Sequence, residues 1–130
     1  FLTFTTATPL QWAVTEALGL PAEWHCEHRA RYAAAKQQLT TGLSQAGFAV
    51  LPSSGSWFVT IDLAASGLPD NDEAVAERLI RKAGVAAIPV SAFYAGAPEK
   101  GYLRLCFAKQ AATLDEAIGR LARFRRTTAA

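Results

Sequence analysis

The sequence predicts an α+β (α/β) domain, in which helices pack mainly on one face of a small antiparallel or mixed sheet of three to four strands. Three observations support this fold class. The chain has 130 residues, 51% of them hydrophobic, which suits one domain with a core. Segments with helical and strand periodicity follow in the order helix, helix, two strands, helix, two strands, helix. The strands alternate apolar and mixed faces, as in a sheet covered on one side.

Two helices are expected first. Thr8 followed by Pro9 predicts an N-cap with proline at the first helical position, in a helix that runs to about residue 18. After the break "GLP" at 19–21, Pro21 begins a long helix over residues 22–46, which Gly47 ends. Its apolar residues share one side: Trp24, Tyr32, Ala35, Leu39, Leu43 and Ala46.

A hairpin follows the long helix. "FAVLP" at 48–52 and "WFVTIDL" at 57–63 are typical of strands, and "SSGS" at 53–56 is typical of a turn. In the second strand the apolar face, expected to pack on the helices, comprises Trp57, Val59, Ile61 and Leu63. The opposite face is mixed.

The second half repeats the pattern of helix and strands. Asp70 or Asn71 is expected to cap a helix ended by Gly84, with an apolar stripe of Val75, Leu79, Ile80 and Ala83. "VAAIPV" at 85–90 predicts a short buried strand that Pro89 stops. Thr113 and Glu116 predict a capping box for the last helix, whose buried side is Leu114, Ala117, Ile118, Leu121 and Phe124.

Arg104 lies in the middle of "YLRLCF", residues 102–107, a segment typical of an apolar strand. At the strand period it shares a face with Tyr102 and Cys106, which shield a guanidinium from water. A permanently charged planar fork in that position needs an anionic partner. An ion pair with an acidic group such as Asp62 and a site for a ligand carboxylate explain it equally well.

The sequence gives little indication of metal binding, nucleic-acid binding or catalytic groups. "HCEH" at 25–28 supplies two histidines, too few for a metal site, so we expect a solvated helix face and no metal. The arginines of "RLARFRRTT" suit a helix C-terminus better than nucleic acid. A net charge of +2, two cysteines and no spanning segment indicate a soluble cytoplasmic domain without membrane or nucleic-acid partners. No residue of this chain is a candidate acid, base or nucleophile.

Four segments, in this order and spacing, carry a family resemblance: "ATPLQWAV", "GFAVLPSSGSWFVTIDL", "GVAAIPVSAFY" and "YLRLCFAKQAATLDEAIGRL". They are similar to the C-terminal region of class I/II pyridoxal-phosphate-dependent aminotransferases, especially the kynurenine and methionine aminotransferase subgroup, which includes succinyldiaminopimelate aminotransferases. The resemblance implies that residues 1–130 form the small domain of a fold-type I enzyme, and that 1–20 lead from a large domain upstream. A chain beginning with Phe1 rather than Met fits that expectation.

The resemblance also implies roles for residues. Arg104 matches the arginine that binds the α-carboxylate of the substrate. Phe4 and Thr5 match a position that contributes to the substrate pocket of a neighbouring subunit, and Ser91 and Phe93 lie in a segment that approaches the site. The Schiff-base lysine and the other pyridoxal 5'-phosphate ligands belong to the large domain. We therefore expect a homodimer when full length, amino-acid and 2-oxo-acid substrates, and no activity in this chain alone.

Two alternatives remain on the same fold. A carbon–sulfur lyase or synthase also holds the carboxylate of an amino acid. A transcription regulator with an aminotransferase-like sensor domain would carry a DNA-binding module upstream. Fold alone does not decide among these functions.

Overall fold

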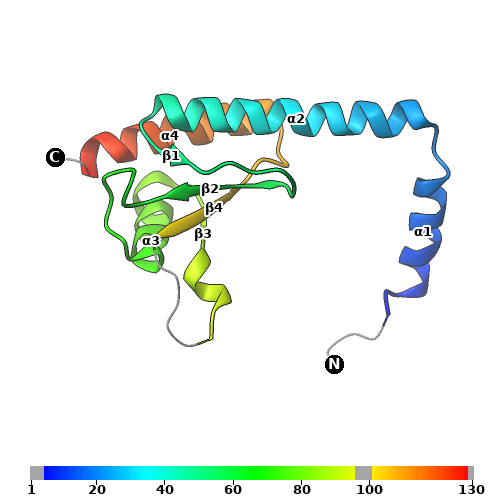
Figure 1. Cartoon of the computed structure of the whole chain (residues 1–130), viewed down its shortest axis with the longest axis horizontal. Helices are drawn as coiled ribbons and strands as arrows, with labels where there is room; N and C mark the ends of the chain where they lie inside the picture. The colour runs from blue at the N-terminus through cyan, green and yellow to red at the C-terminus, as the bar shows by residue number, and fades with distance from the viewer. Residues whose placement is uncertain (1–4, 96–100, 129–130) are drawn as a thin grey trace. The chain divides into compact units, whose positions relative to one another are not determined.

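The computed structural model describes residues 5–95 and 101–128 (Figure 1). The chain divides into two compact units, Phe1–Arg31 and Tyr32–Ala130, and each is described by itself. The elements are α1 (Thr8–Leu18), α2 (Ala22–Gln45), β1 (Ala49–Val50), β2 (Phe58–Asp62), α3 (Asp72–Ala83), β3 (Ile88–Pro89), a 3-10 helix η1 (Val90–Phe93), β4 (Tyr102–Cys106) and α4 (Ala111–Thr128). The expected order of helices and strands is confirmed.

The first unit contains α1 and the beginning of α2. Ala7, not Thr8, is the N-cap of α1, and no side chain caps the helix, so the predicted Thr8 cap is wrong. Thr8 is the first residue of α1 and Pro9 is the second. Proline is accepted at the second position as well as the first, because the N–H that it lacks would have no partner within the helix. No residue of α1 is buried. Its apolar side chains Leu10, Trp12, Val14 and Leu18 are all more than half exposed.

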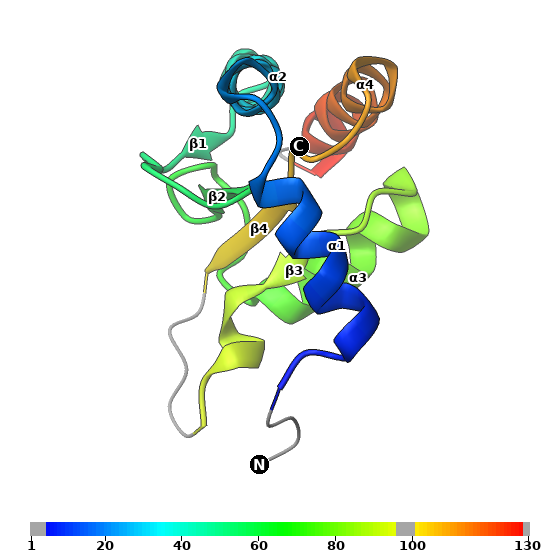
Figure 2. The ribbon, with the colours of Figure 1, turned by 90° about the vertical axis from the view of Figure 1, so that its right-hand side faces the viewer.

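The second unit is built on a four-stranded antiparallel sheet in the order β1-β2-β4-β3 (Figure 2). The long central pair is β2 and β4, which runs in register from Phe58 opposite Cys106 to Asp62 opposite Tyr102. The outer strands β1 and β3 each contribute only two residues. The centre of β4 is therefore flanked by strands on both sides.

One face of this sheet carries the core. Side chains alternate along β2 and β4, so that Val59, Ile61, Leu103 and Leu105 are at most 5% exposed. The part of α2 from Tyr32 onward, α3 and α4 all add side chains to the same cluster, among them Leu39, Leu43, Val75, Leu79, Leu121 and Phe124. The prediction of a sheet with one covered face is confirmed.

The apolar periodicity overreached at several positions. Trp24, predicted on the apolar side of the long helix, is 42% exposed, and Ile88, in the strand expected to be buried, is 40% exposed because the two-residue strand β3 lies at the edge of the sheet. Trp57 is 56% exposed because β2 begins only at Phe58, and Trp57 lies where the strand alternation has not yet started.

Ile80 is 55% exposed because it lies at the margin of the α3 face whose centre is Val75 and Leu79. Ala76, one turn earlier, is buried and belongs to that face.

The helix ends show which capping signals are reliable. Asn71 caps α3 through its side chain, which accepts a hydrogen bond from the Ala74 N–H, and Gly84 ends that helix at φ 64°. The capping box expected at Thr113 is wrong, since α4 begins at Ala111. Glu116 instead pairs with Arg120, one turn further along α4.

Candidate functional site

Arg104 lies at the centre of β4, on the face of the sheet opposite the core. Its neighbours in register are Thr60 of β2 and Ile88 of β3. The side chains of β2 and β4 on this face are all half-buried: Phe58, Thr60, Asp62, Tyr102, Arg104 and Cys106. A cation in this position is partly shielded from water and is held by a strand that is paired on both sides.

Two aromatic rings hold the guanidinium of Arg104. Its Cζ lies 4.1 Å from the centroid of the Phe58 ring and 5.1 Å from that of the Phe93 ring. Rings at such distances stabilise a guanidinium through its faces and leave the N–H groups at its edges to bind an acceptor. Phe58 was not predicted as a site residue, although strand alternation places it on the face of Arg104.

The internal ion pair that the sequence left open does not form. Within residues 5–95 and 101–128, the ion pairs join Arg81 to Glu77 and Arg120 to Glu116. Asp62 lies opposite Tyr102, and its Oδ1 accepts a hydrogen bond of 2.9 Å from the N–H of Ala65 in the turn after β2. The alternative of an Arg104–Asp62 pair is therefore excluded, and the edge of the guanidinium has no acidic partner in the described part of the chain.

The other predicted site residues lie in different surroundings. Phe93 is 61% exposed and belongs to η1, directly after β3. Ser91, in the same turn, is 7% exposed, and its hydroxyl donates to Asp72 rather than pointing to open space. Thr5 is exposed in the first unit, where its hydroxyl accepts from Gln11. Phe4 lies outside the described residues.

The histidines of α2 are part of a ring cluster. Trp24 stacks on His28 with 4.9 Å between ring centroids and meets His25 edge-on at 5.2 Å. Among the described residues, no group of three His, Cys, Asp or Glu side chains is placed to hold a metal ion. Within the same ranges, no helix combines the length and apolar character needed to cross a bilayer.

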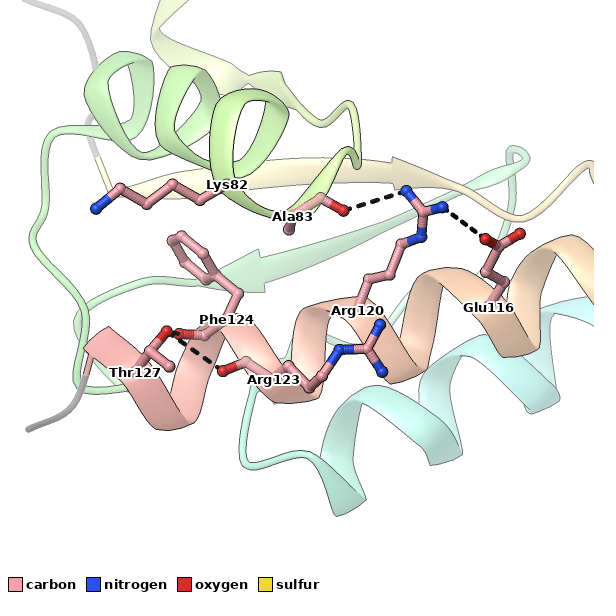
Figure 3. A pocket seen from close by; sticks show the side chains of 7 residues that line it. All are labelled: Lys82, Ala83, Glu116, Arg120, Arg123, Phe124 and Thr127. Atoms are coloured by element: carbon pink, nitrogen blue, oxygen red, sulfur yellow. Dashed lines mark hydrogen bonds and ion pairs between the residues drawn. The ribbon is translucent and has the colours of Figure 1, made fainter.

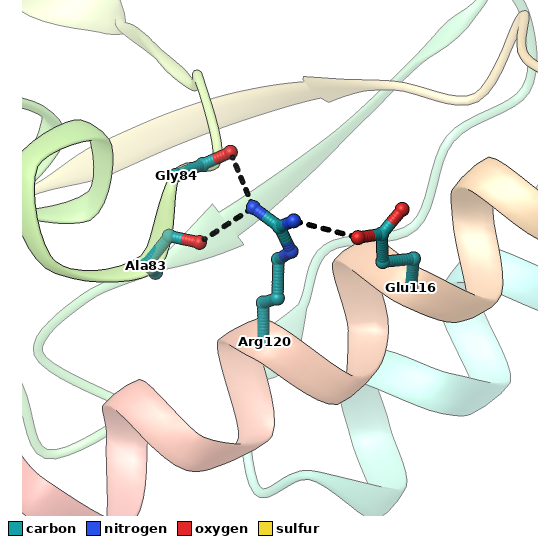
Figure 4. Close-up of polar contacts among 4 residues, drawn as sticks. All are labelled: Ala83, Gly84, Glu116 and Arg120. Carbon is teal, nitrogen blue, oxygen red and sulfur yellow. Dashed lines mark hydrogen bonds and ion pairs between the residues drawn. The ribbon is translucent and has the colours of Figure 1, made fainter.

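A second, more basic surface lies on the helical side of the second unit. A pocket of about 470 Å³ between α3 and α4 is lined by Lys82, Ala83, Glu116, Arg120, Arg123, Phe124 and Thr127 (Figure 3). Its central cation already has partners, because Arg120 donates to the carbonyls of Ala83 and Gly84 and pairs with Glu116 at 2.6 Å (Figure 4). Arg120 thereby satisfies carbonyls at the C-terminus of α3. Arg120 is thus occupied by helix capping and an ion pair, whereas Arg104 on the sheet face has no acidic partner among the described residues.

The same contact yields a test of the helix end. We expect Gly84→Ala to lower the free energy of unfolding by about 1–2 kcal/mol, since alanine is strained in the left-handed conformation. The added Cβ would also lie 2.6 Å from Arg120 Nη1 and displace it from the carbonyls. Urea titration followed by circular dichroism measures the change. Gly55→Ala is the matched control, because its Cβ would meet nothing within 4 Å, and an equal loss there would contradict the explanation.

Comparisons with known proteins find relatives that match most of this chain. The family model for class I and II aminotransferases matches residues 1–121. The probable N-succinyldiaminopimelate aminotransferase of Mycobacterium tuberculosis is 37% identical over 130 residues, which cover 93% of this chain and 32% of the relative. The methionine aminotransferase of Escherichia coli is 34% identical over 121 residues, with 93% and 31% covered.

Solved structures show the same fold. The structure of the M. tuberculosis N-succinyldiaminopimelate aminotransferase matches with a TM-score of 0.82 and 37% identity, over 94% of this chain and 32% of that one. An E. coli protein with a methionine aminotransferase function matches with a TM-score of 0.78 and 33% identity, over 94% and 32%. The chain thus spans about a third of the length of the proteins it matches.

Proposed function

This chain belongs to the class I and II aminotransferase family, and on that premise we propose that the whole protein transfers an amino group between an amino acid and a 2-oxo acid. Residues 1–130 would form its C-terminal small domain, with 1–20 as the segment that leads from the large domain. This chain contributes the arginine that binds the substrate carboxylate.

The observation that carries the proposal is the state of Arg104. Its guanidinium is half-buried, contacts the rings of Phe58 and Phe93, and lacks an acidic partner among the described residues. A carboxylate matches the two parallel N–H groups of the fork, and partial burial strengthens such a pair. Binding at the carboxylate fixes one end of an amino acid and so orients its α-amino group and Cα towards the rest of the protein.

The family implies pyridoxal 5'-phosphate, and the described residues of this chain do not fit that cofactor. Covalent attachment needs a lysine near the substrate. Lys36 donates to the carbonyl of Ser53, and Lys82 and Lys109 line pockets against α4, on the helical side of the sheet. None of these three lies with Arg104 on the open face. We therefore assign the cofactor to the part of the protein outside this chain.

The assembly follows from the same premise. We propose a cytoplasmic homodimer in which the large domain of the same protein covers the first unit. The support for coverage of the first unit is α1, where Trp12 is 69% and Leu18 73% exposed in the chain by itself. Apolar surface of this extent is typical of an interface rather than of a solvated helix. In that dimer, Phe4 and Thr5 would contribute to the substrate pocket of the neighbouring subunit.

An amino-transfer assay on the full-length gene product tests the proposal. Incubation with a panel of amino acids, including methionine and N-succinyldiaminopimelate, and a 2-oxo acid is expected to give the exchanged pair of products. Release of a thiol or ammonia from the amino acid would instead indicate the lyase alternative, and binding without turnover would indicate the sensor alternative. The 130-residue chain, assayed in parallel, is expected to show neither turnover nor cofactor absorbance.

A further inference from the structure

We propose that Asp72 is a positioning residue of the substrate site. Through Ser91 it fixes the turn η1, and η1 holds Phe93 against Arg104. The inference rests on the proposed role of Arg104 in carboxylate binding. It assigns a function in that site to a buried acid that lies at the start of α3, outside the sheet.

Asp72 is the most buried acidic residue of the described chain, at 1% exposure. Its Oδ2 accepts a hydrogen bond of 2.9 Å from the Ser91 N–H, and its Oδ1 accepts one of 2.7 Å from the Ser91 hydroxyl. Oδ1 also accepts from the Glu73 N–H at 3.0 Å. A carboxylate is costly to bury, and these bonds compensate for the loss of water.

Helix capping does not account for this burial. Asn71 already caps α3 through its side chain, and an acid in the first turn interacts favourably with the helix dipole without being buried, as exposed Glu73 does. The Asp72 carboxylate accepts from both polar groups of Ser91, one with each oxygen. The specific consequence of Asp72 is therefore the attachment of η1 to α3.

Ser91 is linked to Arg104 through the turn η1 and the ring of Phe93. Phe93 is two residues from Ser91, and the Tyr94 N–H closes the turn on the Ser91 carbonyl at 3.1 Å. The ring of Phe93 is 61% exposed and so has little packing of its own to hold it 5.1 Å from the Arg104 Cζ. The strand before η1 is only two residues long. η1 contacts both α3 and β4, and the bonds to Asp72 are the polar link on the α3 side. They therefore help to determine where the ring lies, and the ring restricts the guanidinium to an orientation ready for a carboxylate.

Asp72→Asn in the full-length protein tests the inference. The carboxylate accepts from the Ser91 N–H, the Ser91 hydroxyl and the Glu73 N–H, whereas an asparagine amide has only one acceptor oxygen. At least one backbone N–H therefore loses its acceptor, and the charge that strengthens the bonds to Ser91 is removed, so the attachment of η1 to α3 is weakened. We expect the KM for the amino donor to rise about fivefold to tenfold while kcat changes less than twofold, the pattern of lost binding. Cofactor absorbance is expected to be unchanged. Glu73→Gln, which removes an exposed charge from the same turn, is the matched control and should leave KM unchanged.

A double-mutant cycle separates positioning from general destabilisation. If Asp72 acts through the ring, Asp72→Asn combined with Phe93→Ala should raise KM no more than Phe93→Ala alone. Multiplicative effects, or an unchanged KM in folded Asp72→Asn, would overturn the inference. If Asp72→Asn does not fold, Ser91→Ala replaces it in the cycle and should give a smaller rise in KM with the same lack of additivity.

Arg104→Ala is measured in parallel so that the two proposals fail separately. If Arg104→Ala raises KM and Asp72→Asn does not, the positioning role is wrong and the carboxylate site stands. If Arg104→Ala leaves KM unchanged, the proposed function of this arginine is wrong, and the role of Asp72 is overturned with it.

Discussion

Replacing Arg104 by alanine in the full-length protein is expected to lower kcat/KM for the amino donor about 10- to 100-fold. The reason is the loss of a bidentate, partly desolvated pair, which contributes about 1.5–3 kcal/mol. Arg104→Lys should lose less, because the charge remains while the planar fork is absent. Steady-state kinetics with varied donor measures both, and cofactor absorbance should stay at the wild-type level.

Arg78→Ala is the matched control for that prediction. Arg78 is half-buried like Arg104 and lies over an aromatic ring, with its Cζ 5.7 Å from the centroid of Phe124. It belongs to α3 on the helical side of the sheet, away from the open face. We expect its removal to leave kcat/KM unchanged. Equal loss of donor binding and of cofactor in Arg104→Ala would show that the arginine supports structure, not the substrate.

Local sequence signals located most elements of the fold. Asn71 and Gly84 mark the two ends of α3, because capping and the left-handed φ depend on the residue itself. The alternation in β2 and β4 identified the covered face, because in a strand of a one-sided sheet every second side chain meets the core. Because these signals depend on residues close together in the chain, they can be identified from a single sequence.

The errors arose where tertiary contacts decide. The motif at Thr113 resembles a helix start, yet α4 begins at Ala111, where Gln38 of α2 donates to the Ala111 carbonyl at 3.1 Å and to Asp115 at 2.6 Å. A contact across 73 residues is invisible to a local motif. The error at the exposed Ile80 is smaller, since helical periodicity identifies the apolar side of a helix but not how many residues across it are buried.

Some residues of the candidate site could likewise be predicted from local patterns, and others could not. Strand alternation alone placed Arg104 on the uncovered face, and it would also have placed Phe58 there. Asp72 gave no signal, because an acid at the start of a helix is common and its partner Ser91 is 19 residues away. The residue that contacts a ligand is thus easier to read from a sequence than the residue that positions it.

Ile61→Ala is expected to lower the free energy of unfolding by about 2–5 kcal/mol, a large fraction of the roughly 5–15 kcal/mol typical of a domain. Ile61 of β2 is 0% exposed and lies opposite Leu103 of β4. Its truncation leaves a cavity between the sheet and the helices that the paired strands cannot close. Urea titration of the 130-residue chain, followed by circular dichroism, measures the loss.

Ile80→Ala provides the control, because it removes the same atoms from a side chain that is 55% exposed. Its cost is expected to be within about 0.5 kcal/mol, the usual range for surface positions. Similar losses at the two isoleucines would contradict the assignment of the core to one face of the sheet. That assignment also decides the site, because Arg104 alternates with Leu103 and Leu105 along β4 and is free to meet a carboxylate only if those two leucines face the helices.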